Sequence, residues 1–423
     1  MPSWWYAAGA VAHWRGVVAP GAQSVYEGTY WDPVTRTYAT VTRSTSATIY
    51  DPVLRRIFDV RAGFIPQCCW SCSYPGGRGY APVIEEARTN ALAYSYFTSQ
   101  ADVNQWTMDA SGTATVGTAG LYTGSKGVTL VADASGNRAF WRTFTSTAVA
   151  RMVSARVYTN GAAVTSADMQ LCAAAGSSTP VGTLLTTTFT ALGGGWYRAT
   201  APYTGTAATW AAGIAVKAGK TVFADALQEE IGASATSYIP TTAAAATRDA
   251  CVVTEPTTGW SAAAGTLVAV AMPEVASGIA RALVGIAGTS GTNNALGFGI
   301  SSAGAATVLD FAGANGGWVS PTAGAAVASV PAVYAATYGS LKCRAYKNGT
   351  GGTELDTDDA NGIAATAYLG ANRLGVPSCN GPIPQLVVFS TALTAAQVLA
   401  LNSLLSGIAP SRIPALMAAG VIR

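Results

Sequence analysis

The chain has 423 residues, of which 24 are Lys or Arg and 21 are Asp or Glu, and its formal net charge is +3. Charged residues make up 11% of the sequence, whereas soluble domains usually carry about 25%. Because no run of Lys or Arg occurs, neither nucleic acid nor an anionic membrane surface is an expected partner. No stretch approaches the roughly 18 to 20 consecutive apolar residues of a spanning helix, so membrane insertion is not expected.

The first 40 residues are rich in aromatic side chains and contain Pro and Gly breaks without a helical period. So short a segment has little core of its own in which to bury rings such as Trp4, Trp5 and Trp14. The rings either fold back on the following domain or dock onto another protein, since aromatic residues are enriched at the centres of interfaces. We favour docking to another protein through Trp4, Trp5 and Trp14.

Histidine and cysteine limit the chemistry. His13 is the single histidine, which leaves at most one base for a Ser-His-Asp or Cys-His arrangement and no His-rich metal site. The seven cysteines are odd in number and cannot all pair within one chain. Cys68, Cys69 and Cys72 form a cluster for which a disulfide, a zinc site with a fourth ligand and plain burial all stay open.

Beyond residue 90 the sequence consists of short alternating segments rich in Thr, Val, Tyr and Trp, such as 140–146, 152–159 and 196–204. Gly, Ser and Asn turns separate them, and no amphipathic helix lies between them. This pattern favours an antiparallel sandwich or jelly roll over a βαβ arrangement. We therefore predict an all-β fold with two antiparallel β-sandwich domains in tandem.

A second series of strands follows an Ala/Thr-rich link, and we place a domain boundary near 245–255. The pair Asn348-Gly349 stands between two alternating runs, which predicts a β-hairpin. The strands of this series are predicted at 265–272, 296–302, 332–338, 343–350 and 385–390.

One short helix is predicted near the C-terminus, because Thr394 can cap it and Val398, Leu401 and Leu405 recur at helical spacing. Its apolar stripe should pack on the second sandwich. The tail at 408–423 carries two prolines and no long-range pattern. It either covers a neighbouring surface or is loosely ordered.

Four separated stretches carry a resemblance to a known family. In order and spacing they resemble a family of bacteriophage virion proteins, in which a leading segment enters a jelly roll like a carbohydrate-binding module. The resemblance covers about residues 41–250. The stretches are TRSTSATIYD at 42–51, IEEARTN at 84–90, GGGWYRAT at 193–200 and FADALQEEIGASATSYIPTTAAAATRDA at 223–250.

The sequence from residue 255 onward resembles the closing half of concanavalin-like, laminin-G-type lectin domains. The features that carry this resemblance are the hairpin at Asn348-Gly349, the pair Asn380-Gly381 before QLVVFS, and TALTAAQVLAL. Composition and the two resemblances together predict five ranges. These are a docking segment at 1–40, a leading segment with the Cys cluster at 41–90, a carbohydrate-binding-module-like jelly roll at 91–248, a concanavalin/laminin-G-like sandwich at 251–407 ending in a helix, and a tail at 408–423.

Paired carboxylates invite an enzyme interpretation. Glycoside hydrolysis needs two carboxyl groups held about 5 to 10 Å apart across a bond, whereas Glu85 and Glu86 are adjacent and have Arg88 nearby. We interpret these three residues as a structural clamp. At Glu229 and Glu230, strand alternation predicts one side chain inward and one outward. The inward one should be hydrogen-bonded, to Arg248 or to backbone amides.

Other candidate residues give weaker signals. Asp356, Asp358 and Asp359 lie in an acidic run without the spacing of a calcium loop. A solvated loop is expected there, with a metal left open. Trp106, Trp210 and Trp318 are expected to be buried rather than to form sugar platforms, so no glycan-binding residue is assigned.

These observations predict a structural fibre, spike or decoration protein of a bacteriophage head or tail. It is anchored by its N-terminus, assembled in the host cytoplasm and located in the virion. Its expected partners are other virion proteins, further copies of itself as a homo-oligomer, most simply a trimer, and host surface glycans. The alternative is a carbohydrate-active receptor-binding lectin or depolymerase. We expect no cofactor, no resident metal and no enzyme activity, although distant carboxylates such as Asp225 and Asp310 could meet across a cleft.

Overall fold

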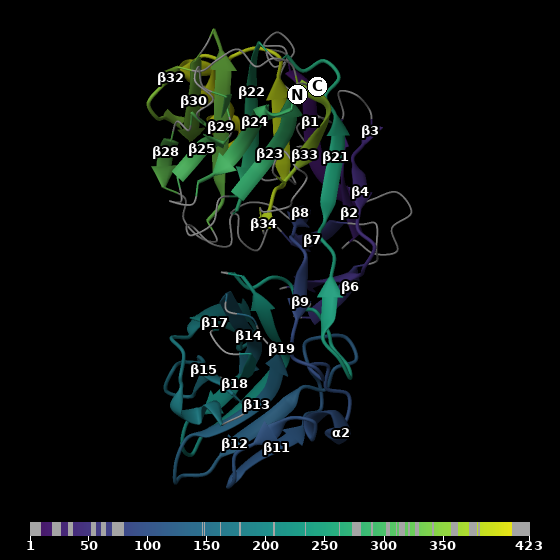
Figure 1. Cartoon of the computed structure of the whole chain (residues 1–423), viewed down its shortest axis with the longest axis vertical. Helices are drawn as coiled ribbons and strands as arrows, with labels where there is room; N and C mark the ends of the chain where they lie inside the picture. Colours follow the sequence, from purple (N-terminus) through teal and green to yellow (C-terminus); the bar gives the residue numbers. More distant parts are fainter. Residues whose placement is uncertain are drawn as a thin grey trace. The chain divides into compact units, whose positions relative to one another are not determined.

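The computed structural model divides into two compact units, one of residues 1–45, 60–87 and 249–423 (unit 1) and one of residues 46–59 and 88–248 (unit 2) (Figure 1). The chain passes between them at 45/46, 59/60, 87/88 and 248/249. The structure describes residues 10–18, 27–32, 37–51, 56–60, 65–69, 80–145, 147, 149–160, 162–176, 179–205, 208–232, 234–261, 263–272, 281–288, 291–301, 305–309, 311–312, 318–319, 322–325, 330–340, 342–356, 363–371, 379 and 381–407.

Antiparallel sheets dominate both units, which confirms the predicted all-β sandwich fold. Across the described ranges, the helical elements are the short helix α2 (Gln100–Val103), the helix α3 (Ala395–Gly407) and the 3-10 turn η2 (Pro180–Gly182). None of these helices is long and apolar enough to cross a membrane.

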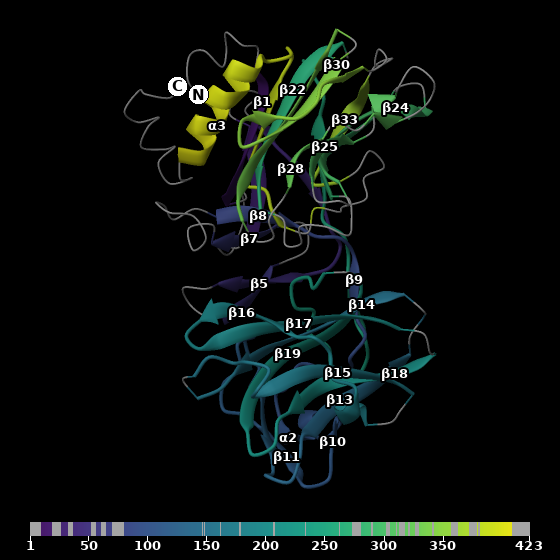
Figure 2. The ribbon, with the colours of Figure 1, turned by 90° about the vertical axis from the view of Figure 1, so that its left-hand side faces the viewer.

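Unit 2 is a sandwich of a six-stranded and a four-stranded sheet, which Figure 2 shows as two layers. The six-stranded sheet has the order β11 (Gly112–Val116), β12 (Val128–Ala132), β19 (Thr221–Ile231), β14 (Ala150–Tyr158), β17 (Trp196–Thr204) and β16 (Thr188–Gly193). The four-stranded sheet has the order β10 (Thr107–Met108), β13 (Arg138–Thr145), β18 (Thr209–Val216) and β15 (Met169–Ala175). Two short pairs complete the unit, β5 (Ala47–Asp51) with β6 (Arg56–Val60) and β9 (Arg88–Asn90) with β20 (Ala246–Arg248).

Strand alternation determines which side chains of unit 2 enter the core. In β12, Val128, Leu130 and Ala132 are buried in the core between the sheets, whereas Thr129 and Val131 are half-buried on the outer face. A strand with one face in the core and one face outward shows this period of two residues. The same alternation runs through β11 and the middle of β17. In β14, residues 151–157 are all buried, and Val153, Ala155 and Val157 are the side chains that enter the core between the sheets.

Unit 1 is built on a twelve-stranded and a seven-stranded sheet. The path of the first is β31 (Thr350–Gly351), β30 (Lys342–Lys347), β29 (Ala332–Gly339), β22 (Ala264–Ala271), β35 (Gln385–Phe389), β1 (Ala10–Val18), β2 (Glu27–Asp32), β7 (Ile65–Cys69), β8 (Tyr80–Ile84) and β34 (Gly381–Pro382), with β3 (Thr37–Tyr38) on β2 and β32 (Leu355–Asp356) on β30. The second has the order β28 (Thr322–Ala325), β25 (Ala305–Leu309), β24 (Gly291–Ile300), β23 (Arg281–Gly288), β33 (Ile363–Leu369), β21 (Val252–Pro256) and β4 (Thr40–Thr42). A separate pair is formed by β26 (Phe311–Ala312) and β27 (Trp318–Val319).

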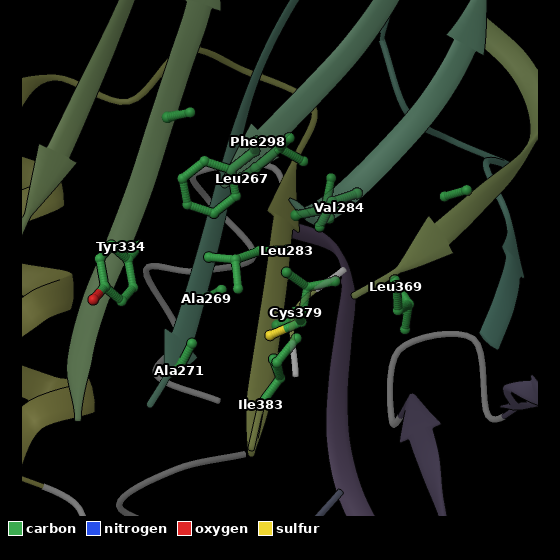
Figure 3. Packing of buried hydrophobic residues seen from close by; sticks show 14 of the residues in the cluster. Leu267, Ala269, Ala271, Leu283, Val284, Phe298, Tyr334, Leu369, Cys379 and Ile383 are labelled. Atoms are coloured by element: carbon green, nitrogen blue, oxygen red, sulfur yellow. The ribbon is translucent and has the colours of Figure 1, made fainter. Parts of the chain in front are cut away.

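The core of unit 1 lies between these two sheets. Leu267 and Tyr334 come from β22 and β29 of one sheet, and Val284, Phe298 and Leu369 come from β23, β24 and β33 of the other. Figure 3 shows these side chains packed together. Each is fully or almost fully buried, so burial of apolar area is the main stabilising contribution to this sandwich.

The predicted hairpin and C-terminal helix are both present. Asn348 and Gly349 join β30 to β31 with φ of 49° and 79°, the left-handed backbone of a two-residue hairpin turn. Thr394 accepts the backbone N–H of Gln397 through Oγ1 (3.3 Å), and its own N–H donates to Gln397 Oε1 (2.8 Å). This reciprocal capping box begins α3, and Val398, Leu401 and Leu405 are buried as expected. Figure 2 shows α3 along one side of the sheet that contains β1 and β22.

The N-terminal segment contributes strands to unit 1. Strand β1 pairs with β35, where Trp14 lies opposite Leu386, and on its other edge with β2. The described strands within residues 1–40 therefore belong to the sheet of the second sandwich, as expected if this segment folds back on a following domain. Trp4 and Trp5 lie outside the described residues, and Trp14 is described in its backbone alone. Docking through these three rings stays a prediction.

Candidate functional site

Two stretches that carry the phage-protein resemblance, IEEARTN and TSYIPT, meet in a buried polar network of unit 2. Asn90 ends the first stretch in strand β9 and is 0% exposed. Its amide nitrogen donates to Ser95 Oγ (3.1 Å) and to the carbonyl oxygens of Leu227 (3.2 Å) and Ile239 (2.9 Å), and its Oδ1 accepts the N–H groups of Leu92 and Glu229 (3.1 Å each).

The network continues through hydroxyl groups. Ser95 Oγ is hydrogen-bonded to Tyr238 Oη (2.9 Å) and to Thr241 Oγ1 (2.7 Å). Ser95 N–H donates to Thr241 Oγ1 (2.9 Å), and Thr241 Oγ1 donates to Leu92 O (2.5 Å). All of these residues are buried, and buried polar groups of this kind are costly to leave unpaired. These hydrogen bonds hold residues 90–95 against residues 227–241, two parts of unit 2 that are distant in the sequence.

The proposed clamp residues lie next to this network in the chain. Glu85 is buried and accepts the N–H of Cys251 through its backbone carbonyl (2.9 Å), while Glu86 is half-buried. Arg88 is buried and lies opposite Arg248 in the backbone register of β9 and β20. Its guanidinium lies directly against Gly232. The structural clamp of Glu85, Glu86 and Arg88 stays a prediction.

Glu229 and Glu230 point to opposite faces of β19, but both are 0% exposed. On the core side, Glu229 accepts Arg151 Nη1 with both oxygens (2.6 Å each) and Tyr203 Oη (2.9 Å). On the outer side, Glu230 accepts Thr236 N–H (3.0 Å) and Thr236 Oγ1 (2.5 Å). The outward carboxylate is buried because the segment that carries Thr236 covers that part of the sheet.

The partner of the inward glutamate therefore differs from the sequence-based expectation. Arg248 donates to the carbonyl and hydroxyl oxygens of Ser237 (3.2 and 2.6 Å), and Arg151 pairs with Glu229. Arg151 lies on β14 opposite Ile231 in the register, a relation that the linear sequence does not display. Burial raises the pKa of Glu229, and the hydrogen bond and charge of Arg151 oppose that shift.

Asp225 is a second fully buried carboxylate, on the outer face of β19. It accepts the N–H groups of Leu121 (2.6 Å) and Tyr122 (3.0 Å) and the hydroxyl of Ser125 (2.7 Å). These bonds fasten the loop that joins β11 to β12 onto the outer face of the sheet. Burial raises the pKa of Asp225 above its ordinary value of 3.8, against the lowering effect of these hydrogen bonds.

We expect the raised pKa of Asp225 to make the stability of unit 2 fall as pH rises. Between pH 3.8 and the higher pKa of the folded state, the unfolded chain releases a proton that folded Asp225 keeps. The free energy of unfolding should thus decline from about pH 4 upward, and less steeply in Asp225→Asn. Urea unfolding at several pH values measures both slopes. Asp133→Asn is the control, because hydrogen bonds from Ser135 and Arg138 lower the pKa of Asp133 and reverse the sign; equal slopes in wild type and Asp225→Asn would contradict the expectation.

Three aromatic side chains gather on the outer face of the six-stranded sheet, and we call them the aromatic cluster: Tyr158, Trp196 and Phe223. They come from the neighbouring strands β14, β17 and β19, and Tyr158 lies directly opposite both of the others in the register. The ring centroids of Tyr158 and Trp196 are 5.7 Å apart, and those of Trp196 and Phe223 are 5.8 Å apart in an edge-to-face arrangement. All three are half-buried, so each ring keeps part of its surface accessible.

Glycine backbone beside the aromatic cluster makes room for the rings. The ring of Tyr158 lies against Gly195, whose φ of +82° also favours glycine, and a Cβ there would meet Tyr158 Cε2 at 2.7 Å. The ring of Phe223 lies in the same way against Gly117 and Gly127. Rings packed closely against backbone are restrained in orientation, which reduces the entropy lost when a ligand stacks on them.

The remaining sequence candidates lie elsewhere. Trp106 and Trp210 are buried, and Trp106 stacks on Phe140 at 5.0 Å. Asp356 pairs with Lys342 on an exposed hairpin. Among the described residues, no group of three or more His, Cys, Asp or Glu side chains could hold a metal ion. The structure does not describe four of the candidate residues, Cys72, Asp310, Asp358 and Asp359. For three others, Cys68, Cys69 and Trp318, it describes the backbone alone.

Comparison with known proteins gives matches to solved structures alone. No protein-family model matches the chain, and no curated protein matches it. The Ruminococcus gnavus IT-sialidase CBM40 is similar at 17% identity and a TM-score of 0.29, over 34% of this chain and 84% of that one. The NanB sialidase from Streptococcus pneumoniae (19%, TM-score 0.29) and the Trypanosoma rangeli sialidase (12%, TM-score 0.30) are matched over 35% and 36% of this chain, which spans 26% of each of them.

The expectation that the chain is not an enzyme is corrected by this comparison, because two of these three similar structures are sialidases. That expectation rested on the single histidine and on carboxylates that are adjacent in the sequence or have an arginine nearby. Glycoside hydrolysis is carried out by carboxylates, and in sialidases by a tyrosine nucleophile, so a histidine count does not exclude it. The chain contains 21 Asp or Glu and 18 Tyr.

Proposed function

We propose that this chain is a glycan-binding adhesion protein, and that the aromatic cluster on the outer face of unit 2 is its binding site. The observation that carries the proposal is the position of the cluster: three half-buried rings from three neighbouring strands of one sheet face. Sugar rings expose C–H groups on their faces, and these pack on the electron-rich faces of aromatic side chains. Hydroxyl groups at neighbouring strand positions supply hydrogen bonds to the sugar edges.

The setting that we propose is a bacteriophage particle. The sequence resemblance of residues 41–250 to virion proteins supports it, and the low charge of the chain is compatible with an assembled fibre, spike or decoration protein. We further propose that the chain assembles in the host cytoplasm with other virion proteins and as a homo-oligomer, most simply a trimer. Native mass measurement of the purified chain and mass spectrometry of purified particles test these two statements.

Replacing Trp196 with alanine tests the binding site. Its half-buried indole is the largest ring of the cluster and contacts the other two, so its removal should weaken glycan binding about tenfold or more, as loss of an aromatic anchor does. Titration calorimetry with a glycan selected on an array measures the dissociation constant. Tyr368→Ala is the matched control, because Tyr368 is a half-buried ring on β33 of unit 1. Loss of binding in Tyr368→Ala with full binding in Trp196→Ala would place the site in unit 1 and overturn the proposal.

A further inference from the structure

The strand positions around the aromatic cluster are occupied mainly by threonine. On the side of β11 and β12, the outer face carries Thr113, Thr115 and Thr129. On the side of β16 and β17, it carries Thr188, Thr190 and Thr200. Four of these six are exposed and two are half-buried. Each hydroxyl can both donate and accept a hydrogen bond, which suits the hydroxyl groups of a sugar.

Charged side chains also occur on this outer face, in the positions next to the cluster, but they are engaged within the protein. Asp225 and Glu230 are 0% exposed and hydrogen-bonded as described above. Arg156 is 5% exposed and lies opposite Asp225 in the strand register. Arg198 is half-buried and donates from Nη2 to the carbonyl oxygen of Thr236 (2.5 Å).

Tight recognition of an anionic sugar calls for a cationic partner. A carboxylate, sulfate or phosphate that loses water at a binding site is compensated most strongly by a cation, and Arg offers the best-directed, bidentate hydrogen bonds. At the described outer-face positions of the six strands, the two arginines are directed to internal acceptors or buried, and most exposed positions carry threonine. The exposed Lys126 lies outside these strands, in the connection directly before β12. A neutral sugar has no such requirement, because ring stacking and hydroxyl hydrogen bonds satisfy it.

From this arrangement we infer that the aromatic cluster takes a neutral glycan, made of sugars without carboxylate, sulfate or phosphate groups. The inference rests on the proposed function and specifies the ligand class of the same site. Binding of such a ligand depends on stacking and on hydrogen bonds between uncharged groups. Its dissociation constant is therefore nearly independent of ionic strength.

A charge-reversal pair at Thr190 tests the inference. Thr190 is exposed on β16, opposite Arg198, and is a near neighbour of Trp196 on the adjacent strand. The variants Thr190→Lys and Thr190→Glu introduce opposite charges of similar bulk at one place. Toward an acidic glycan they should change the dissociation constant in opposite directions, by about threefold each. Toward a neutral glycan, the two variants should have equal dissociation constants.

The measurement uses an array of neutral hexose and N-acetylhexosamine oligosaccharides, each paired with the same glycan extended by a sialic or uronic acid. We expect binding to neutral members, equal affinity in Thr190→Lys and Thr190→Glu, and less than a twofold change between 50 and 500 mM NaCl. A different result would overturn the inference of a neutral ligand: binding to acidic members alone, with affinities that Thr190→Lys and Thr190→Glu change in opposite directions. If Trp196→Ala also abolished that binding, the proposed site on the aromatic cluster would still be supported. Absence of binding to every member, by a chain that is folded by circular dichroism, would overturn both.

Discussion

Replacing Asn90 with alanine is expected to lower the free energy of unfolding of unit 2 by about 3 to 5 kcal/mol. Asn90 is fully buried, and five hydrogen bonds join its amide to segments around residues 92, 95, 227 and 239. The truncation leaves carbonyl and N–H groups buried without a partner, and each such group costs about 1 to 3 kcal/mol. Urea unfolding followed by circular dichroism measures the change.

The neighbouring Thr89 supplies the control for Asn90. It is exposed on the same strand, and its hydroxyl is hydrogen-bonded to Thr247 Oγ1 (2.8 Å). Thr89→Ala should cost less than about 1 kcal/mol, the usual net worth of one hydrogen bond. Equal effects of the two substitutions would show that the Asn90 network does not hold unit 2 together.

Removal of the Glu229 carboxylate is the other change with a large expected effect. In Glu229→Leu, Arg151 stays 97% covered without its counter-charge, since it is 3% exposed in the folded chain, and Tyr203 loses its acceptor. Breaking a buried pair from one side costs about 3 to 5 kcal/mol. Thermal and urea unfolding of the isolated chain measure the loss.

The double variant Arg151→Met, Glu229→Leu separates lost pairing from lost packing. Replacing both partners by apolar side chains removes the uncompensated charge, so the double variant should recover most of the stability that Glu229→Leu loses. Asp133→Ala breaks the more exposed pair with Arg138 and should leave the free energy of unfolding nearly unchanged, because water screens an exposed pair. A double variant as unstable as Glu229→Leu would contradict this account of the Arg151–Glu229 pair.

Local patterns in the sequence predicted individual elements well. Alternation over 196–204 coincides with strand β17, and the pair Asn348-Gly349 and the cap at Thr394 mark the hairpin and the start of α3. These features depend on neighbours within a few residues, where backbone conformation and capping are decided by local chemistry. The all-β class followed from the same local signals.

Pairings between distant segments could not be predicted in this way. Strand β1 pairs with β35, whose partner residues lie 370 to 379 positions further along the chain, and no local signal specifies that register. The same holds for the aromatic cluster, because Tyr158, Trp196 and Phe223 become neighbours only through the registers of β14, β17 and β19. Alternation within each strand could have shown which rings share a face of that strand. It could not show that the three rings are neighbours, because the strand order and register of the sheet decide that.

Buried polar residues were the least predictable part of the candidate site. Asp225 and Glu230 occupy outward positions of β19, where alternation alone predicts exposure, yet the loop before β12 and the segment after β19 cover them. Their burial follows from how those connections fold back over the sheet, which is decided by the whole of unit 2 rather than by the strand.

The central claim is that glycans bind on the aromatic cluster of unit 2, and a crystal structure of the chain with its best array glycan tests it most directly. The account predicts a sugar ring in van der Waals contact with the indole of Trp196, with hydroxyl groups hydrogen-bonded to neighbouring threonines. A well-ordered glycan bound to unit 1, or elsewhere on unit 2, with the aromatic cluster open to solvent would contradict it.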